Sequence, residues 1–79
     1  MVPVHPGGLL RRELTARKLS ANALARALRV PPRRIIDILN AKRGISAETA
    51  LRFGRYFGNG GRFWMAFQSR YDLAVAERD

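Results

Sequence analysis

The sequence predicts an all-α fold of five helices, and three observations support this prediction. Apolar residues recur at spacings of three and four along most of the chain, as they do in helices with one buried face. No segment alternates apolar and polar residues with the period of two that a half-buried strand shows. Serine, proline and glycine residues suited to helix ends separate the periodic segments.

The first two helices are predicted over about residues 6–18 and from Ser20 to near Leu28. Pro6 suits a first helical position, where a backbone N–H would have no partner in any case. Ser20 suits the position that caps a helix start, because its hydroxyl can accept from a free backbone N–H. The apolar stripes are Leu9, Leu10 and Leu14 in the first helix and Leu24, Ala25 and Leu28 in the second.

The third helix is predicted to open at Pro32 and to end near Asn40. Pro31 disfavours helix in Val30, whereas Pro32 can occupy an opening helical position. Gly44 lies in the loop that follows, where it is available for a positive φ angle. The residues of the buried face are Ile35, Ile38 and Leu39.

The last two helices are predicted over residues 47–57 and from near Arg62 to residue 79, with a glycine-rich loop over residues 58–61 between them. Ser46 suits the cap of the fourth helix. The apolar residues at helical spacing are Ala50, Phe53 and Phe57 in the fourth helix and Trp64, Phe67, Tyr71, Ala74 and Val75 in the fifth.

The length of 79 residues fits one small domain, and we expect residues 1–79 to form it, with the last helix (about 62–79) contributing to dimerisation. An apolar content of 47% is too high for a disordered chain. The absence of cysteine excludes disulfides and thiolate metal sites. No apolar run approaches the roughly 20 residues of a membrane span, and no signal-peptide pattern opens the chain. We therefore expect a cytoplasmic protein.

The net charge of +9 favours a polyanionic partner such as nucleic acid. The excess is concentrated in one part of the chain. Residues 11–43 hold ten basic and two acidic residues, a net charge of +8, whereas residues 44–79 hold a net charge of only +1. The second and third predicted helices, and the helix before them, therefore carry nearly all of the excess.

The third predicted helix has one apolar and one polar side. At about 100° per residue, the side opposite Ile35 carries Arg33, Asp37 and Asn40, with Arg34 and Ile36 on the flanks. Arginine can bind guanine bidentately, a carboxylate can accept from cytosine, and an aliphatic group can contact the thymine methyl. With the short capped helix upstream, this pattern is typical of a helix-turn-helix that reads DNA. The alternative is a charged face that contacts only solvent.

Short motifs occur along nearly the whole chain. They are His5-Pro6-Gly7, Leu19-Ser20-Ala21, Val30-Pro31-Pro32, Asn40, Lys42-Arg43-Gly44-Ile45-Ser46, Phe63-Trp64, Gln68 and Tyr71-Asp72. These motifs resemble those of the HigA-type antitoxins of toxin-antitoxin modules, also called virulence-associated protein I. The helix-turn-helix itself is similar to that of the phage-repressor-like XRE superfamily, whose framework positions match Leu24, Ala25, Val30, Ile35 and Ile38.

The resemblance implies a five-helix, lambda repressor-like helix-turn-helix domain. It further implies a homodimer that binds an inverted-repeat operator in double-stranded DNA and represses its own operon. In many members the protein also neutralises a RelE-like ribonuclease toxin. Carried over residue by residue, the resemblance implies base reading by Pro32, Arg33, Ile36 and Asp37. The implied contacts to the DNA backbone come from Ser20, Asn22, Arg29, Arg34, Asn40, Lys42 and Arg43.

The chain departs from the family pattern at several positions. Arg29 stands where family members usually have glycine, and a left-handed conformation there would cost about 1 to 2 kcal/mol. Gly8 replaces a common glutamate, Ala41 a common glycine and Ile36 a frequent serine. We expect a different operator sequence, and a weaker electrostatic attraction to a basic toxin than an acidic antitoxin would have.

All seven aromatic residues lie on the last two predicted helices. Large aromatic residues are enriched at the centres of protein interfaces. We therefore assign Trp64, Phe67 and Tyr71 to a dimer or toxin interface. Core packing is the alternative, above all for Phe67, which lies at helical spacing.

No pattern in the sequence indicates a catalytic, metal or cofactor site. His5 is the only histidine and suits a capping or surface role better than a metal ligand. We therefore expect a non-enzymatic repressor with no cofactor. The alternatives are an XRE regulator without a toxin partner, a nonspecific nucleic-acid or ribosome-associated protein, and a small basic ribonuclease. The ribonuclease is disfavoured because such folds usually contain a sheet.

Overall fold

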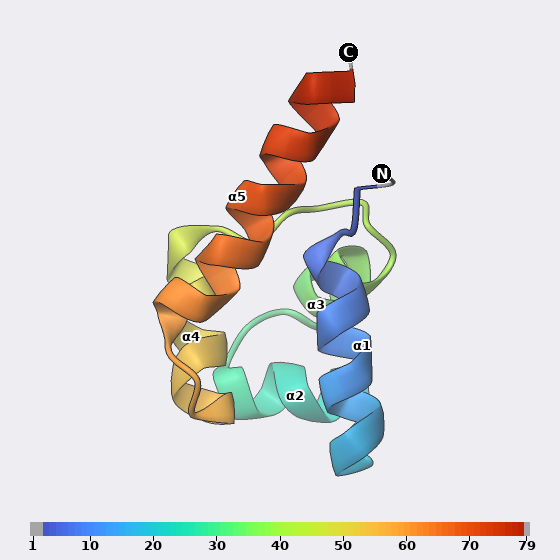
Figure 1. Ribbon diagram of the computed structural model, residues 1–79. Helices are drawn as coiled ribbons and strands as arrows, with labels where there is room; N and C mark the ends of the chain where they lie inside the picture. Colours follow the sequence, from blue (N-terminus) through green and yellow to red (C-terminus); the bar gives the residue numbers. More distant parts are fainter. Residues whose placement is uncertain (1–2, 79) are drawn as a thin grey trace.

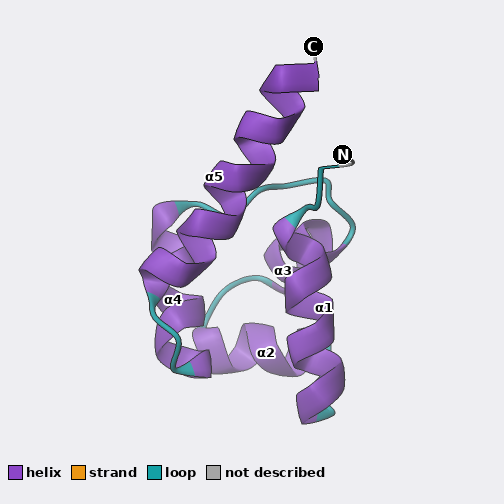
Figure 2. Ribbon diagram, in the orientation of Figure 1, coloured by secondary structure: helices purple, strands orange, loops and turns teal. Residues whose placement is uncertain are grey.

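A computed structural model of the protein describes residues 3–78, and these residues form five helices and no strand (Figure 2). The all-α prediction is therefore confirmed, and each predicted helix is present within a residue or so of its expected bounds. Asp79, the end of the predicted fifth helix, lies outside the described residues. The helices are α1 (Pro6–Arg17), α2 (Ala21–Leu28), α3 (Pro32–Leu39), α4 (Ala47–Phe57) and α5 (Gly61–Arg78).

The helices enclose one core, and α5 extends beyond it. Figure 1 shows α1 and α4 on opposite sides with α2 crossing between them, while α5 lies along α4 and runs past the other helices. The molecule is accordingly elongated, with extents of 37 × 22 × 21 Å. None of the helices within residues 3–78 has the length and apolar character needed to cross a membrane.

Side-chain caps set the starts of three helices. Ser20 Oγ accepts from the backbone N–H of Ala23 at 3.0 Å, and Ser46 Oγ accepts from that of Thr49 at 3.3 Å. Both predicted serine caps are therefore confirmed. His5 caps α1, since its Nδ1 accepts from the N–H of Gly7 at 2.9 Å.

Three residues with side chains take left-handed backbone conformations at the ends of helices. The φ angle is +53° at Lys18, +57° at Arg29 and +60° at Ala41. The strain predicted for Arg29 is therefore present, because a Cβ in this region approaches the following carbonyl. The positive φ expected at Gly44 was wrong, because Ala41 takes it instead. A Cβ at Gly44 would lie 2.9 Å from Gln68 Nε2, so a larger residue there would have to displace the Gln68 amide.

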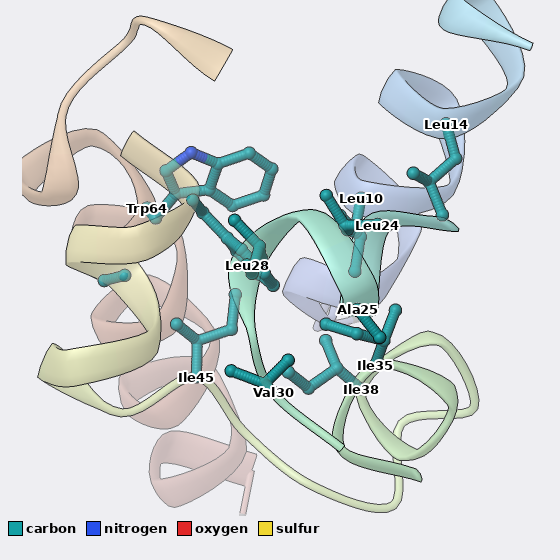
Figure 3. Close-up of a cluster of buried hydrophobic side chains, with 12 residues drawn as sticks. Leu10, Leu14, Leu24, Ala25, Leu28, Val30, Ile35, Ile38, Ile45 and Trp64 are labelled. Carbon is teal, nitrogen blue, oxygen red and sulfur yellow. The ribbon is translucent and has the colours of Figure 1, made fainter. Parts of the chain in front are cut away.

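The core draws side chains from all five helices, and Figure 3 shows most of them pointing into one volume. Its buried residues include most of the predicted stripes of α1, α2 and α3, whereas Leu9 and Leu39 are only partly buried and pack against the core. The contribution of α4 and α5 is aromatic, with the ring centroids of Phe53 and Trp64 5.1 Å apart. The core residues are Leu10, Leu14, Leu24, Ala25, Leu28, Val30, Ile35, Ile38, Ile45, Ala50, Phe53 and Trp64.

The burial of Trp64 corrects its assignment to an interface. Its side chain is 0% exposed, so it offers no surface to a partner. The indole Nε1 donates to Asn59 Oδ1 at 2.8 Å, which satisfies the one polar group that burial would otherwise leave unpaired. The turn before α5 folds this helix back onto α4, and this non-local packing is what a helical spacing pattern does not reveal.

Candidate nucleic-acid interface

The buried side of α3 is fixed against the core and leaves the opposite side free. Ile35 and Ile38 are fully buried. Pro32 and Arg33 are exposed at the start of the helix, and the Arg33 side chain retains 73% of its accessible surface. Ile36 and Asp37, the other two predicted base-reading residues, are half-buried, which leaves part of each residue accessible. The start of α3 is therefore the part of this helix that is most accessible to a groove of DNA.

Ion pairs orient the arginines of α3. Arg33 Nε lies 3.5 Å from Asp37 Oδ1, one turn along the helix. Such an exposed pair is worth only about 0.3 to 0.5 kcal/mol, so both groups can exchange it for contacts to bases. Arg34 NH1 donates to Glu48 Oε1 at 2.8 Å and so joins α3 to the first turn of α4. Sequence reasoning missed Glu48, because nothing local links position 34 to position 48.

The side chains predicted to contact the DNA backbone are nearly all at the surface. They lie at the start of α2, in the turn between α2 and α3, and in the loop after α3. Arg34 is the exception, being half-buried beside Glu48. The exposed members are Ser20, Asn22, Arg29, Asn40, Lys42 and Arg43.

The basic surface continues from α2 onto α4. A shallow hollow between these helices is lined in part by Arg29, Arg52 and Arg55. Arg52 NH1 donates to the carbonyl of Leu28 at 2.6 Å, which satisfies an acceptor at the end of α2. Sequence reasoning did not connect Arg29 with Arg52 and Arg55, which lie more than 20 positions further along the chain.

The loop of residues 40–46 between α3 and α4 is attached to α5. The N–H of Ile45 donates to Gln68 Oε1 at 2.7 Å, and Gln68 Nε2 donates to Asp72 Oδ1 at 2.9 Å. Gln68 is a buried polar residue on the inner face of α5. Two sequence signals point to Gln68: it is one of the motifs that resemble the HigA-type antitoxins, and it lies four residues after Trp64, where a helical stripe would continue with an apolar residue.

His5 adds a second attachment of the same loop. Its ring is hydrogen-bonded to the backbone of Arg43 and packs edge-on against Tyr71, with ring centroids 4.8 Å apart. Burial lowers the pKa of His5 below its ordinary value, while the Arg43 hydrogen bond and the charge of Asp72 oppose this shift. The neutral ring is therefore favoured, as its role of acceptor at the start of α1 requires.

The outer face of α5 carries partly exposed apolar residues. Phe67 and Tyr71, the other two residues assigned to an interface, are half-buried. Leu73 is 62% exposed and Phe63 is 38% exposed. Among residues 3–78, no cluster of histidine, cysteine or carboxylate side chains could hold a metal ion.

Comparison with known proteins identifies the family. The helix-turn-helix family model matches residues 10–63, from within α1 to the first turn of α5. Virulence-associated protein I of Dichelobacter nodosus is 51% identical over 80 residues, which cover 100% of this chain and 74% of that protein. An addiction module antidote protein of the HigA family from Coxiella burnetii is 44% identical, with a TM-score of 0.95 over 99% of this chain and 86% of that one. The chain belongs to the HigA-type helix-turn-helix family.

A further HigA-type relative has been solved with DNA. The Pseudomonas aeruginosa antitoxin HigA, in a structure with the higBA promoter, is 50% identical to this chain. Its TM-score is 0.92 over 95% of this chain and 83% of that one. HigA-type proteins are non-enzymatic regulators, so the ribonuclease alternative is excluded and the expectation of a non-enzymatic protein is confirmed.

Proposed function

We propose that the protein is a sequence-specific DNA-binding repressor, and the antitoxin of a type II toxin-antitoxin module that represses its own operon. The observation that carries this proposal is the exposed, basic start of α3 on a helix whose other side is buried in the core. The P. aeruginosa antitoxin with its promoter, 50% identical to this chain, supports it. A repressor of this kind acts in the cytoplasm.

The proposed DNA contacts fall into two groups, residues that read bases and residues that contact the DNA backbone. Base contacts carry sequence preference, while phosphate contacts fix the register of the protein and supply salt-dependent affinity. The proposed base-reading residues are Pro32, Arg33, Ile36 and Asp37. The proposed backbone contacts are Ser20, Asn22, Arg29, Arg34, Asn40, Lys42 and Arg43.

The protein is proposed to act as a homodimer of single-domain chains that spans an inverted repeat, with half-sites about one helical turn apart. The end of α5 supports this assembly, because it stands clear of the rest of the molecule (Figure 1) and carries the exposed Leu73. Phe67 and Tyr71 lie further back on the same helix and are the proposed contacts to the second copy or to a toxin.

Neutralisation of a RelE-like ribonuclease toxin is the finer part of the proposal. It has support in the antitoxin names of the relatives. The net charge of +9 favours the second candidate function, an XRE regulator without a toxin partner, because a basic chain attracts a basic ribonuclease weakly. Co-purification with the product of the adjacent gene decides between them. A stable complex that suppresses RNA cleavage supports the antitoxin, and no complex supports the regulator.

Selection of bound duplexes from a random pool tests the DNA-binding function. The purified protein is incubated with the pool at moderate salt, and the recovered DNA is sequenced. The proposal predicts enrichment of an inverted repeat with half-sites about one turn apart. Recovery of DNA with no common sequence would contradict it.

A further inference from the structure

The loop of residues 40–46 has few hydrogen bonds within itself, and it holds three of the proposed contacts to the DNA backbone, Asn40 and the two cations Lys42 and Arg43. Ala41 takes a positive φ of +60°, and the N–H of Lys42 reaches back to the carbonyl of Asp37 at 2.8 Å. Beyond that point the backbone is held by groups from distant parts of the chain. The arrangement of Lys42 and Arg43 therefore depends on residues that are far from them in sequence.

Gln68 supplies one of these groups. Its side chain is 8% exposed, and both ends of its amide are used, by the N–H of Ile45 at 2.7 Å and by Asp72 Oδ1 at 2.9 Å. A backbone N–H can only donate and an ionised carboxylate can only accept, so one orientation of the amide satisfies both partners. Rotation of the amide by half a turn would lose both hydrogen bonds.

The loop also packs directly on the amide. A Cβ at Gly44 would lie within 2.9 to 3.0 Å of three atoms of the Gln68 side-chain amide, so the backbone of Gly44 rests on its face. His5 holds Arg43 through its backbone and rests on Tyr71, which precedes Asp72 on α5. The backbone is therefore fixed at Arg43, at Gly44 and at Ile45.

We propose that Gln68 is a positioning residue for DNA binding, which holds the loop so that Lys42 and Arg43 meet the phosphates without further ordering. This inference rests on the proposed function. Each long side chain immobilised on binding costs about 0.5 to 1.5 kcal/mol, and a mobile loop would add the cost of ordering its backbone. Because Gln68 already holds the loop, the cost of ordering the loop backbone does not arise on binding, although Gln68 does not itself face the DNA.

Gln68→Met tests the role, because methionine has a similar length and neither donates to Asp72 nor accepts strongly from Ile45. Three variants accompany it. Asp72→Asn is the matched control, since its amide oxygen can still accept from Gln68 Nε2. The double variant Gln68→Glu/Asp72→Asn is the rescue, because it exchanges donor and acceptor at constant net charge and keeps an acceptor for Ile45. Lys42→Ala/Arg43→Ala removes the side chains that the loop positions.

The first measurement is amide hydrogen exchange of Ile45 by NMR, on the protein without DNA. The proposal predicts at least about tenfold faster exchange in Gln68→Met, because the N–H loses its buried acceptor and the loop opens more often. Exchange in Asp72→Asn and in the rescue variant stays near that of the wild type. Unchanged exchange in Gln68→Met would overturn the proposal.

The second measurement is affinity for the selected duplex as a function of salt. Gln68→Met is expected to flatten the slope of log affinity against log salt by about one to two units, since each phosphate contact contributes about 0.9. In the Lys42→Ala/Arg43→Ala background the same change is expected to alter affinity less than about twofold, because coupled residues are not additive. The rescue variant restores the wild-type slope.

An equal loss of affinity on Gln68→Met with and without Lys42 and Arg43 would overturn the proposal, because it would show a general loss of structure.

If Gln68→Met does not fold, the rescue variant is compared with Gln68→Glu alone. The proposal then requires the rescue variant to have the steeper slope of log affinity against log salt. A wild-type protein that prefers no duplex would overturn the repressor function itself. That result is distinguishable, because Ile45 exchange is measured without DNA.

Discussion

Arg29 has a strained backbone conformation and an exposed positive charge. It ends α2 with a φ of +57°, and its N–H donates to the carbonyls of Ala25 and Arg26. Glycine would adopt the same conformation without steric cost. The side chain of Arg29 is exposed in the turn before α3 and lines the basic hollow between α2 and α4. The strain is therefore consistent with a residue kept for its charge.

Arg29→Gly is expected to raise the free energy of unfolding by about 0.5 to 1 kcal/mol. The relief of about 1 to 2 kcal/mol of strain is partly offset by the greater freedom of glycine in the unfolded chain. Denaturant unfolding measures the change. Arg26→Gly, within α2, is the control and should lower stability by about 0.8 kcal/mol. A loss of stability in Arg29→Gly would show that no strain is released.

His5 makes stability depend on pH. Because its pKa is lowered in the folded protein, the unfolded chain binds more protons between that lowered value and the ordinary value of 6.5. The contribution of neutral His5 to the free energy of unfolding is therefore complete above pH 6.5. It falls as the pH drops from 6.5 through the pKa of His5 in the folded protein. Protonation also removes the Nδ1 acceptor from Gly7. The side chains near the ring are Asp72, whose charge opposes the shift, and Tyr71, which packs edge-on against it, while Arg43 contacts the ring through its backbone.

Denaturant unfolding at several pH values between 5 and 8 checks this prediction. His5→Asn keeps an acceptor for the start of α1 and does not titrate, so its stability should change less over this range. Equal pH dependence of the two proteins would contradict the assignment to His5.

Among the elements, the start of α3 and the loop after it are expected to respond differently to mutation. Arg33→Ala should cost about 1 to 3 kcal/mol on the selected duplex and relax the base preference. Lys42→Ala should weaken binding to all sequences alike and flatten the salt slope by about one unit. Affinities for the selected duplex and for single-base variants of it, each at several salt concentrations, measure both effects. Identical effects of the two mutations would contradict the assignment of Arg33 to the bases and Lys42 to the DNA backbone.

The helices themselves were largely predictable, because caps and apolar stripes are local. Ser20 and Ser46 cap the helices they were expected to cap, and Ile35 and Ile38 are buried as their spacing indicates. The exposed basic start of α3 was predictable for the same reason.

What escaped prediction depends on contacts between distant segments. Trp64 is buried because α5 folds back onto α4, and its polar atom is satisfied by Asn59. Glu48 pairs with Arg34 across two helices, and Gln68 reaches a loop 23 residues upstream. Periodicity assigns a residue to a face of its own helix and does not say which other segment covers that face.

At the scale of the whole molecule, the end of α5 is the surface proposed for self-association. We expect Leu73→Glu to abolish the proposed dimer while leaving the monomer folded, because the residue is 62% exposed within one chain. Sedimentation equilibrium measures the mass, and circular dichroism checks the fold. Ala16→Glu, which adds the same charge on an exposed part of α1, is the control and should remain dimeric. A Leu73→Glu protein that is still a dimer would place the interface elsewhere.

The protein is proposed to read a DNA sequence through α3, as a dimer of this fold. A competition titration tests it most directly, with the selected inverted repeat against a scrambled duplex of the same length and composition at physiological salt. The inverted repeat is expected to bind at least about a thousandfold more tightly than the scrambled duplex, as specific sites do. Equal affinity for the two duplexes would contradict it.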